Sequence, residues 1–241
     1  MIPLRDRNPT RRTPIVTFAL IGACFAAFAL ELSISGTGGD AALERFFQAW
    51  AAIPADIAAA LQAGDLAGQA TVGMFSSMFL HAGWLHLLGN MLFLWIFGNN
   101  VEDRLGSVLF LLFYLAGGVA AVLAQVAIDP DSTIPLVGAS GAIAAALGAY
   151  IVLFPGARIL SLVFLGFFYQ LLEVPAIIVL GFWFGLQLLS GVAAFDAETA
   201  QGGVAFFAHI GGFVFGLLVG LVLRIVGAGT RWRGQAAGSM G

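Results

Sequence analysis

The chain has 241 residues, of which 60% are hydrophobic and 10% charged, and its mean hydropathy is +0.98. This composition excludes an ordinary soluble domain and indicates a chain whose solvent is lipid. The basic residues are ten in number, all arginine, against 13 acids, and they form no stripe of the kind that binds nucleic acid. We therefore expect a membrane protein of one domain that does not bind nucleic acid.

Six apolar runs approach the roughly 20 residues that a membrane-spanning helix needs. The sequence therefore predicts an all-α membrane protein with a six-helix bundle over residues 14–226, flanked by tails at 1–13 and 227–241. The long first outer loop, 35–82, is expected to lie along the membrane interface or to cover the bundle, and 155–173 is expected to be an apolar connection. The runs are 14–34, 83–100, 106–128, 135–154, 174–191 and 204–226.

The arginines also predict the orientation, because cytoplasmic loops are enriched in basic residues. With the N-terminus inside, only Arg45 lies on the outer side, and both termini are cytoplasmic. The lack of lysine is typical of a GC-rich bacterial genome, so we expect a bacterial cytoplasmic membrane. The arginines on the inner side are Arg5, Arg7, Arg11, Arg12, Arg104, Arg158, Arg224, Arg231 and Arg233.

Few polar side chains lie inside the predicted spans, and burying such groups in lipid is costly enough to make them functional candidates. His86 and Asn90 lie in the second span, Ser140 in the fourth and His209 in the sixth. These three spans run inward from the outer face, and Ser140, His86 and His209 lie roughly 5 to 8 Å below it. A hydroxyl, imidazoles and a carboxamide in one layer are what a nucleophile, a base and an oxyanion site require.

Small residues repeat every four positions in the fourth and sixth spans, and such stripes let membrane helices approach closely. Docking the two stripes would bring Ser140 and His209 near hydrogen-bonding reach. The pattern is also common in helices that pack without any catalytic role. The stripes are Gly212, Gly216 and Gly220 in the sixth span and Gly141, Ala145 and Ala149 in the fourth.

Each polar residue also has a structural interpretation. A membrane serine such as Ser140 can bond back to its own helix backbone, and His86 and Asn90 can link helices. His81 is expected at the interface. His209 could carry protons in a transporter, a function that predicts inverted repeats, and the sequence has no clear internal repeat. The coincidence of residue type, membrane side and depth favours an active site.

Four motifs follow one another between about Phe75 and Gly220. They are His81-Ala-Gly-Trp-Leu-His86-Leu-Leu-Gly-Asn90, Gly98-x-x-x-Glu102-x-x-x-Gly106, Gly138-Ala-Ser140-Gly141 and Ala208-His209-x-x-Gly212-x-x-x-Gly216. In this order they resemble the rhomboid family of intramembrane serine proteases. The resemblance implies Ser140 as nucleophile, His209 as general base, His86 and Asn90 as oxyanion donors, and Glu102 as a brace at the cytoplasmic end.

The expected function is cleavage of transmembrane segments of other membrane proteins near the outer face, by a Ser-His dyad with no cofactor or metal ion. The resemblance implies that substrates enter sideways past the fifth span. They are also expected to carry helix-weakening residues near the outer face, because a regular helix hides its carbonyl groups in its own hydrogen bonds. The loop from Val192 to Gly203 is expected to be a mobile cap. The alternative is a silent relative that binds transmembrane helices without cutting them.

Two positions depart from the family pattern. Many members have an aromatic residue one turn after the serine that packs on the histidine ring, whereas this chain has Ala144. A Trp-Arg pair in the first loop of some members is replaced by Val72-Gly73. No acidic residue is placed to complete a Ser-His-Asp arrangement, so we expect packing on Gly212 to orient the imidazole of His209.

Overall fold

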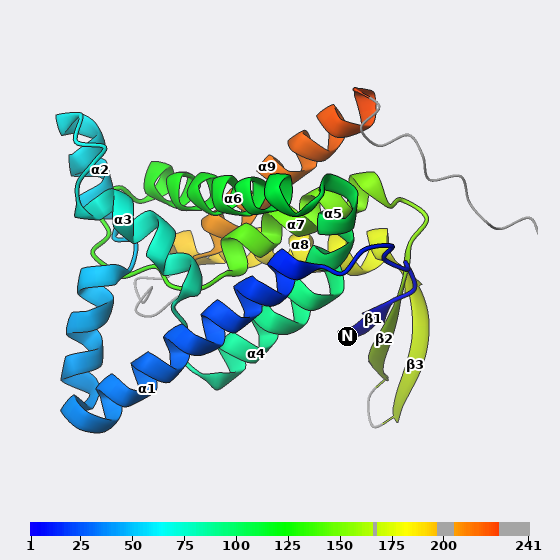
Figure 1. Cartoon of the computed structure of the whole chain (residues 1–241), viewed down its shortest axis with the longest axis horizontal. Coiled ribbons are helices and arrows are strands. Elements are labelled where there is room, and N and C mark those ends of the chain that lie inside the picture. Colours follow the sequence, from blue (N-terminus) through cyan, green and yellow to red (C-terminus); the bar gives the residue numbers. More distant parts are fainter. Residues whose placement is uncertain (166–167, 197–204, 227–241) are drawn as a thin grey trace, which may run out of the picture.

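The computed structural model describes residues 1–165, 168–196 and 205–226, and helices make up most of it (Figure 1). The predicted class, a mostly helical fold with several apolar helices, is confirmed, and each of the six predicted spans contains a helix. The helices of these spans are α1 (Ile15–Trp50), α4 (Trp84–Phe93), the π-helical stretch η2 (Leu94–Gly98), α5 (Asn99–Leu105), α6 (Ser107–Ile128), α7 (Ser140–Leu153), α8 (Ala176–Asp196) and α9 (Phe206–Ile225).

The spans differ in length. Within the described ranges, α1, α6 and α9 are long and apolar enough to cross a membrane alone. The helical segments 69–79 and 84–105 are long and apolar enough only when taken together, and the chain bends by 81° between them. α7 has 14 residues, which is about 21 Å at 1.5 Å per residue and less than the roughly 30 Å apolar core of a bilayer. α7 alone therefore does not reach both membrane surfaces.

The fourth span begins differently from the prediction, because 135–139 is irregular and the helix starts only at Ser140. Pro135 has no N–H to donate, and Gly138 has a φ of 126°, a conformation that cannot continue a helix. Ser140 thus opens a helix at the end of an extended segment.

The first outer loop is folded. α1 continues past the predicted end of its span to Trp50, with a break at Gly39 (φ 69°). The short helices α2 (Pro54–Ala63), α3 (Gln69–Ser76) and η1 (Ser77–Phe79) follow. α2 and α3 pack on α6, and the loop therefore covers one end of the bundle (Figure 1). The buried residues of this contact are Ala52, Ile57, Met74, Val122 and Val126.

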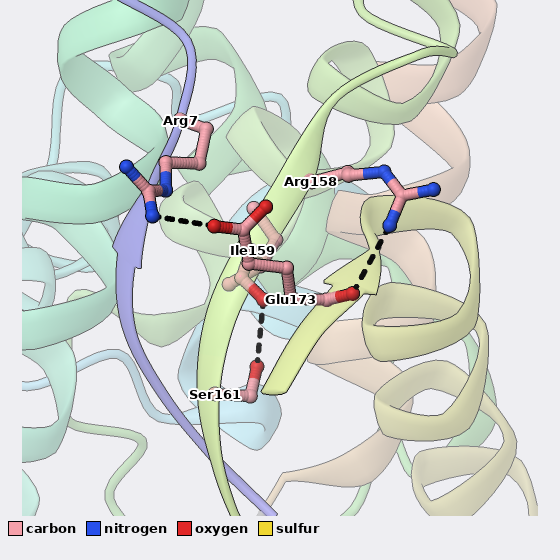
Figure 2. Close-up of polar contacts among 5 residues, drawn as sticks. All are labelled: Arg7, Arg158, Ile159, Ser161 and Glu173. Carbon is pink, nitrogen blue, oxygen red and sulfur yellow. Dashed lines mark hydrogen bonds and ion pairs between the residues drawn. The ribbon is translucent and has the colours of Figure 1, made fainter. Parts of the chain in front are cut away.

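A three-stranded antiparallel sheet lies at the opposite end of the bundle (Figure 1). It consists of β1 (Ile2–Asp6), β2 (Arg158–Leu165) and β3 (Phe168–Pro175), in that order. These segments were predicted to be a tail and an apolar connection, and the prediction is wrong in that both contribute strands. Arg7 forms an ion pair with the Glu173 side chain, and Arg158 donates a hydrogen bond to the Glu173 carbonyl (Figure 2). The sheet thus joins the chain start to the α7–α8 connection.

Glu102 of α5 caps the first turn of α1. Its carboxylate accepts hydrogen bonds from the backbone N–H groups of Val16 and Thr17, at 2.9 and 2.7 Å. The hydroxyls of Thr17 and Ser107 donate to it at 2.8 and 2.7 Å. The first N–H groups of a helix have no partner within the helix, and a negative charge there also complements the helix dipole. Glu102 therefore ties α1, α5 and the start of α6 together.

Replacing Glu102 by alanine is expected to lower the free energy of unfolding by more than about 3 kcal/mol, because each hydrogen bond to a charged group contributes about 1.5 to 3 kcal/mol. Unfolding in detergent micelles measures the change. Asp103→Asn is the control, since among the described residues the Asp103 carboxylate accepts one hydrogen bond, from the Arg12 backbone. Equal stability of Glu102→Ala and the control would contradict the capping role.

The buried carboxyl group of Asp6 should make the stability of the protein depend on pH. Its carboxylate accepts hydrogen bonds from the side chains of Asn100 and Tyr150, at 2.5 and 3.1 Å. Burial nevertheless raises the pKa of Asp6 from 3.8 to about 6. The unfolded chain thus loses this proton first as pH rises, so Asp6 lowers the stability by up to about 3 kcal/mol between about pH 4 and pH 6.

The measurement is the difference in unfolding free energy between wild type and Asp6→Asn. The asparagine does not titrate, so the variant should gain stability relative to wild type as pH rises through this window and hold a constant advantage above it. A difference in unfolding free energy that stays constant from about pH 4 to pH 7 would show that folding does not raise the pKa of Asp6.

Candidate active site

α7 and α9 share the most extensive contact among the helices of the described ranges. Glycines allow their backbones to touch. A methyl group added to Gly212 would overlap the carbonyl oxygen of Gly141, and one added to Gly216 would overlap that of Ala145. A methyl group on Gly148 would likewise meet the backbone of α9. The small-residue stripes of the two helices thus lie against each other with no side chain between their backbones.

This contact brings Ser140 and His209 together. Ser140 is the first residue of α7, and His209 lies in the first turn of α9. The Ser140 Oγ is 2.7 Å from the His209 Nε2. The histidine is 8% exposed, so its ring is almost completely shielded by protein. A serine hydroxyl in contact with a buried imidazole is the arrangement of a nucleophile and its base.

α8 supplies two further contacts to the ring of His209, neither of which was predicted from the sequence. The Gln187 Oε1 lies 2.8 Å from the His209 Nδ1. One turn earlier, the ring of Trp183 lies 5.9 Å from the imidazole centroid, tilted by 40°. Gln187 belongs to no recognised motif, and its spacing of four residues from Trp183 was the signal that could have placed both on one helix face.

The contacts from Gln187 and Trp183 hold the imidazole of His209 in addition to the helix packing at Gly212. We expected packing on Gly212 to orient the imidazole, and Gly212 does contact α7. The ring nitrogen that faces away from Ser140, however, has a hydrogen-bond partner in Gln187. Ala144 is fully buried, and the aromatic ring next to His209 comes from Trp183 on another helix.

His86 and Asn90 of α4 face the segment that precedes Ser140. A Cβ added to Gly138 would lie 2.7 Å from the His86 Nε2 and 3.5 Å from the Asn90 Nδ2. Glycine at 138 therefore leaves room for both side chains. Asn90 is 9% exposed, and its Nδ2 has no hydrogen-bond partner among the described residues. A buried N–H donor beside the serine is suited to bind an oxygen atom.

His81 lies behind this group. It is 1% exposed and packs edge-on against His86, with ring centroids 5.2 Å apart. Its backbone N–H donates to Glu31 at 3.1 Å, and its Nδ1 lies 3.0 Å from the Phe79 carbonyl oxygen. These contacts hold the residue within the fold and leave its ring as support for His86.

A cavity of about 700 Å³ connects these side chains. Its volume lies in the range of about 300 to 1,000 Å³ that is typical of ligand sites. Ser140, His209, His86, Asn90 and Trp183 all line it, among mostly apolar neighbours. The cap was predicted for residues 192–203. Its first part belongs to α8, which continues to Asp196, and residues 197–204 lie outside the described residues. The cavity can hold an apolar chain segment with its polar groups near the serine.

Comparison with known proteins identifies the family. Residues 68–225 match the rhomboid domain. The chain is 32% identical over 174 residues to Rhomboid protein 1, mitochondrial, of Saccharomyces cerevisiae, covering 69% of this chain and 46% of the relative. It is 32% identical over 157 residues to Rhomboid protease GluP of Bacillus subtilis, covering 65% and 27%. The chain therefore belongs to the rhomboid family and is an integral membrane protein. The matches span less than half of these relatives' own lengths.

Gly212→Ala tests the helix contact on which the site depends. The new methyl group would meet the backbone of Gly141, which cannot move aside as a side chain would, so stability is expected to fall by about 1 to 3 kcal/mol. Thermal unfolding in detergent measures the loss. Gly181→Ala on α8 is the control, because nothing lies within 4 Å of a Cβ at that position. Equal melting temperatures for the two variants would contradict the close contact.

Proposed function

We propose that this protein is an intramembrane serine endopeptidase that cleaves transmembrane segments of other membrane proteins near the outer face. The observation that carries the proposal is the 2.7 Å contact between the Ser140 Oγ and the His209 Nε2 on the wall of a cavity. Membership of the rhomboid family supports it, since the similar relative from Bacillus subtilis is named as a rhomboid protease. The arginine distribution supports a cytoplasmic location of both termini, and the lack of lysine supports a bacterial cytoplasmic membrane.

The mechanism follows from the neighbours of the two groups. His209 accepts the hydroxyl proton at Nε2 while the Ser140 oxygen attacks the carbonyl carbon of the scissile peptide bond. The negative oxygen that forms is stabilised by the side chains of His86 and Asn90 and by the N-terminal end of α7. His209 then gives the proton to the leaving amine, and the acyl-enzyme is hydrolysed by a water molecule that His209 deprotonates.

The substrate is expected to be a transmembrane segment that unwinds easily near the outer face. A regular helix keeps its carbonyl groups in internal hydrogen bonds, so a serine cannot reach the carbonyl carbon until the helix opens. α7 is too short to reach both membrane surfaces, which fits a serine recessed in the membrane. Helix-weakening residues at the cut site lower the free energy of opening, and small residues fit the crowded site.

A fluorophosphonate probe and cleavage of a panel of tagged single-pass membrane proteins test the proposal. Wild type should be labelled on Ser140, and both labelling and cleavage should vanish in Ser140→Ala and His209→Ala. Asn90→Ala should retain activity that is reduced about 100- to 1,000-fold, as expected for the loss of one oxyanion donor.

Ser33→Ala is the control, because Ser33 is exposed on α1 and should leave labelling unchanged. A wild-type protein in which Ser140 stays unlabelled and no panel member is cut would favour a silent relative that only binds transmembrane helices. Equal, near-wild-type cleavage by Ser140→Ala and Asn90→Ala would refute the assignment of the site.

A further inference from the structure

The two ring nitrogens of His209 face groups of different chemistry. Nε2 lies 2.7 Å from the hydroxyl of Ser140, which can both donate and accept a hydrogen bond. Nδ1 lies 2.8 Å from the Oε1 of Gln187, which can only accept. A hydrogen bond between Nδ1 and Oε1 therefore requires the ring proton to be on Nδ1. Nε2 is then unprotonated and can take the proton of Ser140.

We propose that Gln187 is a positioning residue that holds His209 in the tautomer with the proton on Nδ1, making the site a Ser140–His209–Gln187 arrangement. The inference deepens the proposed function and rests on it for its catalytic meaning. Gln187 does not touch the reacting atoms and acts through the imidazole. The role is the tautomer and orientation function that a buried aspartate has in soluble serine proteases.

α8 holds the ring by two side chains one turn apart. Trp183 lies beside the imidazole and also packs near Phe213 of α9, with ring centroids 6.2 Å apart. The indole restricts tilting of the imidazole plane, and the Gln187 oxygen restricts rotation within that plane. Together they leave His209 few orientations other than the one that faces Ser140.

A neutral acceptor suits the location of this site. A carboxylate buried in a membrane protein is costly, because its charge loses the hydration that water provides. A carboxamide oxygen orients the ring without that penalty, but it supplies no negative charge to stabilise the imidazolium. Gln187 therefore acts by fixing geometry and tautomer, with a smaller electrostatic contribution than an aspartate would make.

The chain provides a matched control in Gln125 on α6. Its Oε1 accepts a hydrogen bond from the backbone N–H of Ala208, at 3.3 Å. Gln125 thus contacts the residue next to His209 in sequence, whereas the two ring nitrogens of His209 face Ser140 and Gln187. Like Gln187, it is half-buried. Gln125→Leu and Gln187→Leu make the same chemical change beside the same turn of α9, and a merely structural role predicts similar effects for both.

The first experiment reads the tautomer directly from the nitrogen chemical shifts of the protein labelled with ¹⁵N-histidine in detergent micelles, with His209→Ala assigning the signals. Wild type and Gln125→Leu should show His209 protonated on Nδ1 and unprotonated on Nε2. Gln187→Leu should show a mixture of both tautomers. A wild-type ring protonated on Nε2, or an unchanged tautomer in Gln187→Leu, would overturn the proposal. This readout does not depend on proteolysis.

The second experiment follows the rate of fluorophosphonate labelling against pH. Gln187→Leu should slow labelling about tenfold or more, because the ring then samples an unproductive tautomer and orientation. Gln187→Glu restores an acceptor, so labelling should return to within a few-fold of wild type. The midpoint of its pH profile should move to higher pH, since a nearby negative charge favours the protonated ring.

The outcomes separate the positioning role of Gln187 from the proposed protease function. Gln187→Leu and Gln125→Leu with equal rates and unshifted profiles would show that Gln187 contributes to packing alone and would overturn its positioning role. A wild-type protein that is neither labelled nor active would overturn the proposed protease function, while the nitrogen shifts would still decide whether Gln187 sets the tautomer of His209.

Discussion

The approach of two helix backbones, α7 and α9, is the constraint on which the rest of the site depends. In a bilayer, apolar side chains gain little by leaving lipid for another helix, so close van der Waals contact carries much of the association. Gly212 and Gly216 face backbone carbonyl groups of α7 directly. Such contacts cannot adjust by rotating a side chain, so they set the helix separation firmly. The 2.7 Å contact between Ser140 and His209 follows from that separation.

The polar side chains that line or support the cavity carry no fixed charge, whereas several charged groups with defined partners lie at the opposite, sheet-bearing end. Serine, histidine, glutamine and asparagine line or support the cavity, and a neutral hydrogen-bonded group is far less costly to bury than a charge. Glu102 is held by the first turn of α1, and Arg7 pairs with Glu173 beside the sheet. Within the described residues, the ion pair thus lies away from the cavity, and the helix contact and hydrogen bonds position the polar side chains of the cavity.

The sheet and the folded first loop support this core from its two ends. β2 and β3 form the connection between α7 and α8, and a hydrogen bond from the Ala176 N–H to the Ala157 carbonyl, at 2.9 Å, closes the base of that hairpin. The start of α8 is thereby tied to the end of α7, which helps to set where Trp183 and Gln187 lie. At the other end, α2 and α3 pack on α6, next to the segment that leads to Ser140. The isolated bridge between Ala52 and Leu136 links that segment to the first loop.

The sequence by itself determined the membrane class, the positions of the helical spans, the small-residue stripes and the motifs containing Ser140, His209, His86 and Asn90. These features are local, because they depend on composition, on runs of apolar residues and on spacing along one helix. Only the tertiary structure decided that α7 starts at Ser140, that residues 1–13 and 155–175 contribute strands to one sheet, and that Gln187 and Trp183 contact His209. The apolar stretch around 159–172 suits a strand as well as a connection, and its pairing with Ile2–Asp6 joins residues far apart in the chain. The partner of the His209 Nδ1 likewise depends on how α8 leans against α9, which no local pattern encodes.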